Sequence, residues 1–182
     1  MQNHQGHRFN DIGRLRSPER LARLEVERVV DLALAGKPIQ SVLDIGTGTA
    51  VFAEAFAQQG KSIIGIDVNP AMLDAARQYV PAGDFRQSEA EAIPFPNRSV
   101  DLAFMGLVLH ETDNLLQALQ EAHRMTRLRL AILEWPYAEQ EFGPGLQERL
   151  QTNHVMELAR QAGFTAGEII QLAQLVLYRF DA

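Results

Sequence analysis

The chain has 182 residues, 46% of them hydrophobic and 22% charged, which is typical of one soluble globular domain. The formal net charge of −6 at pH 7 disfavours a nucleic acid or an anionic membrane as partner, because the averaged field repels phosphate. The sequence has no cysteine, which excludes disulfides, thiolate catalysis and cysteine-ligated metals, and we expect a cytoplasmic protein because neither a secretion signal nor a membrane-length apolar run is found.

The N-terminal region combines a polar segment with a helical pattern. We expect residues 1–16 to be flexible unless a ligand orders them. Residues 17–36 predict one helix, with Ser17 as N-cap, Pro18 in the first turn and Gly36 as terminator. Five arginines gather here: Arg8, Arg14, Arg16, Arg20 and Arg23. They form either a solvated helix face or a contact surface for an anionic substrate group.

From residue 40 onward, short apolar stretches alternate with helical patterns. The stretches are apolar throughout, which indicates strands buried on both faces of a parallel sheet. Interleaved with helices, they predict an α/β doubly wound domain over residues 40–182, with a seven-stranded, mostly parallel, Rossmann-like sheet. The expected strands are 41–45, 61–67, 84–88, 99–106, 128–135, 167–172 and 175–180, and the expected helices are 49–60, 69–80, 114–125 and 153–163.

Two of these strands, in "VLDIGTGTA" and "IIGIDVNPAML", end in an aspartate. Ligands of such sheets lie beyond the carboxyl ends of the strands, where Asp44 and Asp67 fall. Gly46 and Gly48 let the backbone approach a ligand closely, and a carboxylate at Asp67 suits the vicinal hydroxyls of a ribose. The motifs predict a nucleoside site; the alternative is a tight turn followed by a helix-capping aspartate.

The motifs do not fit a dinucleotide or a triphosphate. Val51 occupies the third glycine position of the dinucleotide fingerprint, and the P-loop lysine and hydroxyl are missing. With "SEAEAIPFPNRSVDLAFMGLVLHETDN" and "EWPYAEQEFGPGLQERL…ELARQAGF", the chain resembles class I S-adenosylmethionine-dependent methyltransferases over residues 42–164. It is most similar to the small-molecule type that includes the ubiquinone/menaquinone-biosynthesis C-methyltransferases.

The resemblance implies S-adenosyl-L-methionine as cofactor and S-adenosyl-L-homocysteine as product. It implies that Asp67 holds the ribose and that Glu89, unless Glu91 takes its place, accepts from the adenine amine. The residues implied at the methionine end are Asp44, Gly46, Thr47, Gly48 and Gly106. Those implied around the adenosine are Asp67, Val68, Met72, Glu89 and the N–H group of Ala90.

The chain departs from the family pattern at two places. Ala50 stands where a third motif glycine is common, and its methyl group is tolerable if φ stays negative. The Lys-Pro-Gly-Gly turn that precedes the fifth strand in the family is missing from "HRMTRLRLAILEW". The chain therefore passes almost directly from helix to strand, on the side of the sheet away from the ligand.

His110, directly after the fourth strand, is the candidate catalytic residue. It could act as a general base if the acceptor must lose a proton, or it could be a cap or packing residue. We expect His123 to be structural and no metal site, although His4 and His7 leave a weak one open. The candidates for walling or polarising the acceptor pocket are Phe9, Trp135, Tyr137, Arg8 and Glu134, and Trp135 could equally belong to the core.

We therefore expect a methyltransferase that acts on a small-molecule acceptor, as a monomer or homodimer, without a nucleic-acid or membrane partner. Oxygen, nitrogen and carbon acceptors stay open, as does closure of the N-terminal segment over the site. One alternative is a non-catalytic S-adenosylmethionine-binding sensor or partner subunit. A nicotinamide-dependent oxidoreductase is disfavoured by Val51 and by the lack of a Tyr-x-x-x-Lys pair.

Overall fold

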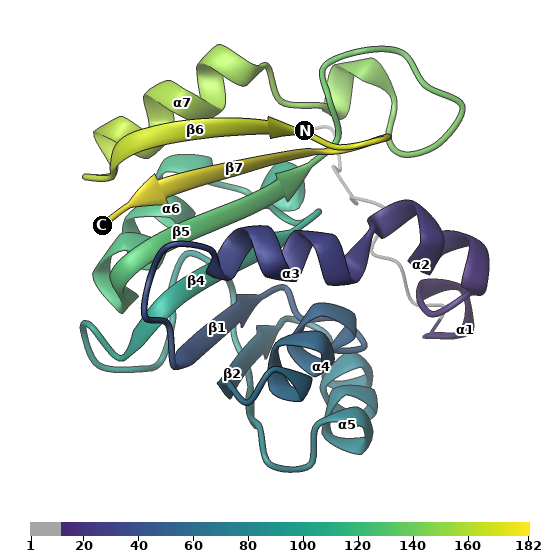
Figure 1. Ribbon diagram of the computed structural model, residues 1–182, viewed down its shortest axis with the longest axis vertical. Coiled ribbons are helices and arrows are strands. Elements are labelled where there is room, and N and C mark those ends of the chain that lie inside the picture. Colours follow the sequence, from purple (N-terminus) through teal and green to yellow (C-terminus); the bar gives the residue numbers. More distant parts are fainter. Residues whose placement is uncertain (1–11) are drawn as a thin grey trace, which may run out of the picture.

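The computed structural model describes residues 12–182, whose strands form one seven-stranded sheet (Figure 1). The strand order is β3-β2-β1-β4-β5-β7-β6, and β7 alone runs antiparallel to its neighbours. The strands are β1 Ser41–Ile45, β2 Ser62–Asp67, β3 Asp84–Gln87, β4 Val100–Gly106, β5 Thr126–Glu134, β6 Thr165–Gln171 and β7 Val176–Asp181. The predicted doubly wound, mostly parallel sheet is confirmed.

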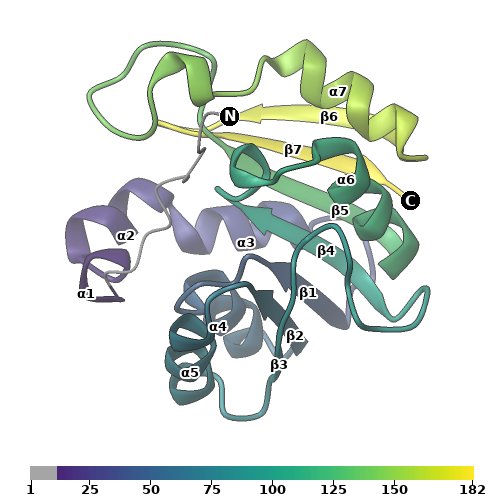
Figure 2. The ribbon, with the colours of Figure 1, turned by 180° about the vertical axis from the view of Figure 1, so that it is seen from behind.

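Helices cover both faces of this sheet. They are α1 Ile12–Leu15, α2 Pro18–Leu24, α3 Val26–Leu34, α4 Val51–Gln58, α5 Pro70–Tyr79, α6 Leu115–Met125 and α7 Thr152–Gln161, with short 3₁₀ helices η1 Leu109–Glu111 and η2 Leu146–Glu148. α3 lies in front of the sheet in Figure 1, and α6 and α7 lie in front in Figure 2, which views the molecule from behind. In the described part of the chain, no helix combines the length and apolarity needed to cross a membrane.

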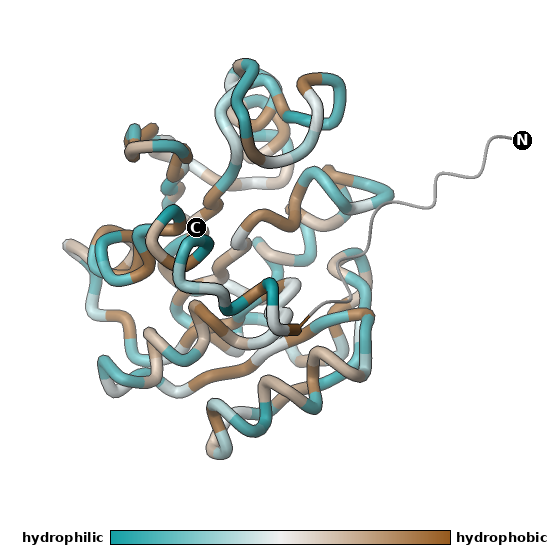
Figure 3. The backbone as a smooth tube through the Cα atoms, turned by 90° about the vertical axis from the view of Figure 1, so that its right-hand side faces the viewer, coloured by the Kyte–Doolittle hydropathy of each residue, from teal (hydrophilic) through white to brown (hydrophobic). Residues whose placement is uncertain are grey.

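The apolar residues gather in two clusters, one on each face of the sheet. One cluster is built from α3, α4 and α5, and the other from α6 and α7. The central strands contribute to both because their side chains point alternately to opposite faces: Val42 belongs to the first cluster and Leu43 to the second. Hydrophobic and hydrophilic residues alternate along the helical turns, as expected of helices with one buried face (Figure 3).

The single helix predicted over residues 17–36 is wrong. Ser17 caps α2 as expected, its hydroxyl accepting from the N–H of Arg20 at 3.3 Å. Glu25, however, adopts a left-handed conformation (φ 47°) and separates α2 from α3. Its carboxylate accepts from the N–H of Ala173 at 2.8 Å and pairs with Arg28 at 2.7 Å. The break thus serves a contact between distant segments, which helical periodicity does not reveal.

The N-terminal segment also differs from its prediction where the structure describes it. Residues 12–15, expected to be flexible, form α1; the expected flexibility of residues 1–11 lies outside the described residues. The short connection before the fifth strand is confirmed, since α6 ends at Met125 and β5 begins at Thr126. α1 and α2 lie beyond the carboxyl ends of the central strands, at the edge where the site residues gather (Figure 1).

Candidate functional site

The site lies at the carboxyl edge of β1, β2, β4 and β5. β1 pairs with β2 on one side and β4 on the other, so the chain proceeds outward in opposite directions from the β1–β4 pair. In an open α/β sheet this reversal leaves a crevice between the loops that follow the two strands. The residues predicted from "VLDIGTGTA" and from "GLVLHETD" therefore meet at one place.

The turn after β1 is fitted tightly against its neighbours. Gly46 has a φ of 68°, and a Cβ atom there would lie 2.8 Å from Val108 Cβ. Gly48 has a φ of 51° but more open surroundings, with only Leu15 Cδ1 at 4.0 Å from such an atom. The N–H of Thr47 donates to the carbonyl of Ile66, at 2.8 Å. The turn therefore contacts the loop after β4, α1 and the end of β2.

A negative φ at Ala50, the condition under which its methyl group was tolerable, is not found in the structure. Ala50 is fully buried and has a φ of 60°, in the left-handed region that favours glycine. Its N–H donates to the carbonyl of Thr47 at 2.8 Å, and its own carbonyl accepts from the N–H of Glu54 at 2.8 Å. The alanine thus takes the backbone conformation of the missing glycine, held by the turn before it and the helix after it.

Asp44 is buried at the end of β1, beneath the turn. Its Oδ2 accepts from the hydroxyl of Thr47 at 2.8 Å. Burial raises the pKa of Asp44 to about 7, and the charge of Asp67 acts in the same direction, against the hydrogen bonds from Thr47 and from the N–H of Ala53. Asp44 thus changes protonation near neutral pH, and an adjacent cation would favour its charged form.

Asp67 connects the two motifs that predict a nucleoside site. Its Oδ2 accepts from the N–H of Gly48 at 2.9 Å, and its Oδ1 accepts from the N–H of Asn69 at 2.8 Å. The carboxylate is thereby held at the tip of β2, beside the turn after β1 that contains Gly46 and Gly48, called the glycine turn below. Because each carboxylate oxygen has two lone pairs, these backbone bonds leave the group able to accept from a ligand as well.

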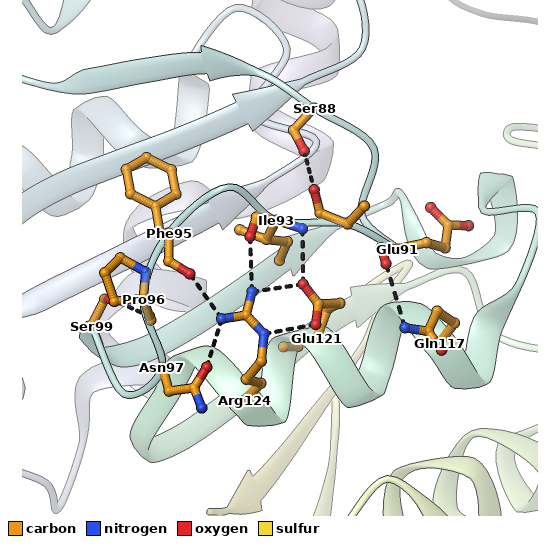
Figure 4. Close-up of polar contacts among 12 residues, drawn as sticks. Ser88, Glu91, Ile93, Phe95, Pro96, Asn97, Ser99, Gln117, Glu121 and Arg124 are labelled. Atoms are coloured by element: carbon orange, nitrogen blue, oxygen red, sulfur yellow. Dashed lines mark hydrogen bonds and ion pairs between the residues drawn. The ribbon is translucent and has the colours of Figure 1, made fainter.

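The predicted adenine residues Glu89 and Ala90 belong to the loop between β3 and β4. Figure 4 shows how Arg124 anchors this loop. Arg124 anchors it from α6, donating to the carbonyls of Ile93 and Phe95, both at 2.8 Å, and pairing with Glu121 at 2.7 Å. Glu91 Oε1 accepts from the N–H of Asn114 at 3.0 Å, so it is engaged at the start of α6. Because Glu91 is already bound, it is less suited than Glu89 to accept from the adenine amine. The side chain of Glu89 is exposed.

Three other predicted cofactor residues line the same edge. Val68 is half-buried, and its carbonyl accepts from the Gln87 side chain at 3.0 Å. Met72 is almost completely buried on α5. Gly106 ends β4, where an added Cβ atom would lie 2.9 Å from Phe104 and 3.1 Å from Phe52. The sheet edge therefore accepts only glycine at position 106 without rearrangement.

His110 is held by Glu134, a pairing that the sequence did not predict. The Nδ1 atom of His110 lies 2.8 Å from Glu134 Oε2, and only 8% of the histidine side chain is exposed. Burial by itself lowers the pKa of His110, but the hydrogen bond and charge of Glu134, helped by Glu111, raise it above its ordinary value. Nδ1 therefore carries the hydrogen in either charge state, and Nε2 is the atom that can exchange a proton.

Glu111 extends the polar group, with its Oε1 atom 3.8 Å from His110 Nε2. Although 42% of its side chain is exposed, desolvation and the charges of Glu134 and Asp67 raise the pKa of Glu111, against His110 and Arg20. This carboxylate thus lies within electrostatic range of both the ribose candidate Asp67 and the base candidate His110. Sequence reasoning missed it, although its position directly after His110 was a usable signal.

Arg16 fixes the N-terminal helices to the glycine turn. Its Nε and Nη2 atoms donate to the carbonyl of Thr49 at 3.2 and 3.1 Å, and Nη2 pairs with Glu54 at 2.6 Å. The guanidinium also lies 3.3 Å over the ring of Tyr79. This part of the arginine cluster is therefore structural, which the sequence left open, and no sequence signal identified Val108 or Leu15 as neighbours of the turn.

The aromatic residues after β5 differ in exposure. Trp135 is buried against Gly143 and lies 5.4 Å from the guanidinium of Arg149, whereas Tyr137 is 45% exposed. His123 is structural as expected, since its ring meets that of Phe164 edge-on at 4.9 Å. The described residues contain no group that could hold a metal ion, and His4, His7, Arg8 and Phe9 lie outside them.

Known proteins share both the sequence pattern and the fold. Residues 43–129 match the family model described as a methyltransferase domain. A crystal structure of an S-adenosylmethionine-dependent methyltransferase from Aquifex aeolicus superposes with a TM-score of 0.81 at 25% identity, covering 93% of this chain and 96% of that one. The chain thus contains a segment similar to a methyltransferase domain, and its fold resembles that of a known S-adenosylmethionine-dependent methyltransferase.

Curated relatives of this family differ in their acceptors. The chain is 33% identical to a malonyl-[acyl-carrier protein] O-methyltransferase of Serratia marcescens over 132 residues, 71% of this chain and 51% of that one. It is 28% identical to a demethylmenaquinone methyltransferase of Renibacterium salmoninarum over 135 residues, 74% of this chain and 55% of that one. The chain thus spans about half the length of the curated relatives it matches.

Replacing Gly46 by Ala should destabilise the protein by about 3 kcal/mol, combining left-handed strain of about 1 kcal/mol with the clash against Val108. Gly60→Ala is the matched control, because Gly60 has a φ of 74° and nothing within 4 Å of an added Cβ atom. Urea denaturation of both variants measures the difference. Adding Val108→Ala to Gly46→Ala should recover part of the loss; equal losses in the two single variants would contradict the packing described here.

The raised pKa of Asp44 predicts how the stability of the protein changes with pH. Between about pH 4 and 7 the folded state binds the Asp44 proton more tightly than the unfolded state, so this group's contribution falls as pH rises and is constant above about pH 7. Asp44→Asn removes that titration. Its stability relative to wild type should therefore increase by up to about 4 kcal/mol from pH 4 to pH 8, at 1.36 kcal/mol per pKa unit. Urea denaturation at each pH, with the exposed Asp74→Asn as control, tests this; parallel stability curves would rule it out.

Proposed function

We propose that this protein binds S-adenosyl-L-methionine at the carboxyl edge of the sheet and transfers its methyl group to a small-molecule acceptor. The observation that carries the proposal is the carboxylate of Asp67, held beside the glycine turn by the N–H groups of Gly48 and Asn69. A fixed carboxylate at the end of the second strand suits the two hydroxyls of a ribose. The match of residues 43–129 to a methyltransferase domain and the likeness to the Aquifex aeolicus structure support it.

The proposed contacts follow the charges of the ligand. Asp67 accepts from the ribose, and Asp44, with a pKa near 7, becomes charged when the cationic methionine end lies above the turn. Glu89 and the N–H of Ala90 take the adenine edge. The residues proposed around the methionine end are Asp44, Gly46, Thr47, Gly48 and Gly106, and those around the adenosine are Asp67, Val68, Met72, Glu89 and Ala90.

The bound sulfonium supplies an already activated methyl carbon, so the protein's main tasks are alignment of the acceptor and exclusion of water. We propose that His110 removes the acceptor's proton through Nε2 when the acceptor is protonated. Glu134 is a positioning residue, since its carboxylate binds Nδ1 at 2.8 Å and raises the pKa of His110. A histidine with this partner is a stronger base in its neutral form than a free imidazole.

The acceptor class, location and assembly are further parts of the proposal. Relatives named for malonyl-[acyl-carrier protein] and demethylmenaquinone support a small acceptor or carrier-bound group, methylated on oxygen or carbon. We propose a cytoplasmic protein, monomeric or homodimeric, without a nucleic-acid or membrane partner, consistent with a net charge of −6. Residues 40–182 would be the catalytic domain and residues 12–34 its N-terminal cap.

Asp67→Ala should weaken binding of S-adenosyl-L-homocysteine about 100-fold, or about 3 kcal/mol, because two charge-assisted hydrogen bonds to the ribose are lost. Calorimetric titration of the wild type and the variant measures the change. Asp74→Ala is the matched control, since Asp74 is an exposed acid on the neighbouring helix α5. Unchanged affinity in a folded Asp67→Ala variant, or no binding to the wild type, would refute the proposed site.

Glu134→Gln should lower the pKa of His110, because the hydrogen bond and charge of Glu134 are what raise it. The pH titration of the His110 Cε1–H signal by NMR measures this without any acceptor. His123, whose ring meets that of Phe164 edge-on, supplies an internal control signal that the substitution at Glu134 should leave unchanged. A His110 pKa that stays the same in the variant would show that Glu134 does not tune the base.

A non-catalytic sensor or partner subunit is the second candidate, since no single side chain is indispensable for methyl transfer. Transfer of labelled methyl from S-adenosyl-L-methionine to any member of an acceptor panel excludes it. Tight binding of the cofactor without turnover across a wide panel of hydroxyl, amine and activated-carbon acceptors favours it.

A further inference from the structure

Arg20 and Arg23 on α2 differ from most arginines of the described chain in having no carboxylate partner. Eight others form ion pairs with aspartate or glutamate: Arg16, Arg28, Arg77, Arg86, Arg124, Arg127, Arg160 and Arg179. Within residues 12–182, the guanidinium of Arg20 makes one hydrogen bond, from Nη1 to the carbonyl of Leu15 at 3.0 Å, and that of Arg23 lies over the ring of Phe142 at 3.7 Å. Within the described residues they share this lack with Arg98, Arg129 and Arg149, of which the last two donate to several backbone carbonyls instead.

Contacts through α1 connect Arg20 to the carboxyl edge of the sheet. Arg20 and Arg23 are three residues apart on α2 and so share one face of the helix. Arg20 donates to the carbonyl of Leu15, the last residue of α1. The side chain of Leu15 lies next to Gly48, in the turn after β1. α1 and α2 lie beyond the carboxyl ends of the central strands (Figure 1), and Arg20 is within electrostatic range of Glu111, the residue next to His110.

The loop that follows β5 contacts α2 through Phe142, which lies under Arg23. Arg149 holds this loop, donating to the carbonyls of Ala138 at 2.6 Å and Phe142 at 2.7 Å. Phe142, the residue under Arg23, is therefore fixed in place by a second arginine. Glu134, the partner of His110, is the last residue of β5, so this loop connects the His110 pair in sequence to Phe142 under Arg23.

The charged side chains between α2 and His110 change from positive to negative. Arg20 is half-buried; burial and the like charges of Arg23 and Arg14 lower the pKa of Arg20, and Glu111 is the acid that opposes them. Glu111 in turn lies 3.8 Å from His110. The α2 end is therefore rich in positive charge, whereas the end nearest the sheet holds the carboxylates of Glu134, Glu111 and Asp67. A solvated helix face, the alternative for this cluster, would place Arg20 in water, as it does Arg28 with 56% of its side chain exposed.

We infer that the methyl acceptor is an anion whose carboxylate or phosphate group binds Arg20 and Arg23, with the reacting atom directed toward His110. The inference rests on the proposed methyl-transfer function and specifies its substrate class. Each guanidinium presents five N–H donors in a planar fork suited to the oxygens of either anion. The positive end also draws such an acceptor to the site against the negative charge of the molecule as a whole.

Three probes that share one ring test the inference: benzoate, phenyl phosphate and the neutral benzamide. Each is titrated into the full-length protein saturated with S-adenosyl-L-homocysteine, and binding is followed by the fluorescence of Trp135, the one tryptophan of the chain. At least one anion should bind about tenfold more tightly than benzamide, and which of the two does so distinguishes a carboxylate from a phosphate site. Equal affinity of all three, or no saturable binding of either anion, would overturn the inference.

Variants separate the two arginines from overall charge. Arg20→Gln and Arg23→Gln should each weaken binding of the preferred anion about tenfold and leave benzamide unchanged. Arg28→Gln is the matched control, with the same change of charge on the adjacent helix α3, and should bind the anion as the wild type does. An equal loss in Arg28→Gln would show a general charge effect and overturn the assignment.

Binding of S-adenosyl-L-homocysteine shows whether a negative result refutes the acceptor class or the proposed function itself. Its affinity should be the same within twofold in wild type, Arg20→Gln and Arg23→Gln, because the two arginines are assigned to the acceptor and not to the cofactor. Wild type that does not bind S-adenosyl-L-homocysteine refutes the proposed function itself. Normal cofactor binding combined with no preference for anions refutes the acceptor class alone.

Discussion

The carboxylate of Asp67 is the point on which this site depends. It joins the tip of β2 to the turn after β1 by accepting the N–H of Gly48, and it holds the start of α5 by accepting the N–H of Asn69. Two strands and the following helix are thus set relative to one another by a single acceptor. Gly46, packed against Val108, adds the loop after β4 to the same unit. The shape of the edge thus depends on the side chain of Asp67, the one proposed to face the ribose, and on the absence of a side chain at Gly46.

The acids at this edge are held in very different surroundings. Asp44 is buried and changes protonation near pH 7, Glu134 is tied to His110, and Asp67 is held by backbone N–H groups. Such a grouping costs folding free energy, since like charges and desolvation both oppose it. A cationic ligand relieves that cost, which is a physical reason for a sulfonium compound to bind here. Sites built for binding are commonly less stable than the scaffold that carries them.

The N-terminal helices are fixed to the edge of the sheet that carries the site. Arg16 fastens them to the carbonyl of Thr49 and to Glu54, so they cover the glycine turn as a fixed part of the edge. The loop after β5, gathered around Arg149, forms the other side. These two segments flank the edge to which we assign the cofactor, and under the proposed function they would contact the acceptor.

The sequence by itself determined the order and type of nearly all elements, because continuous apolar strands and capped helices are local patterns. It also identified Asp44, Gly46, Gly48 and Asp67 as one group, because the carboxyl ends of neighbouring parallel strands must meet. Tertiary structure alone decided what is set by contacts between distant segments. These are the break at Glu25, which bonds Ala173, the His110–Glu134 pair and the division of the arginine cluster between Arg16 and the α2 residues. Each involves partners 24 or more residues apart, and local periodicity carries no record of them.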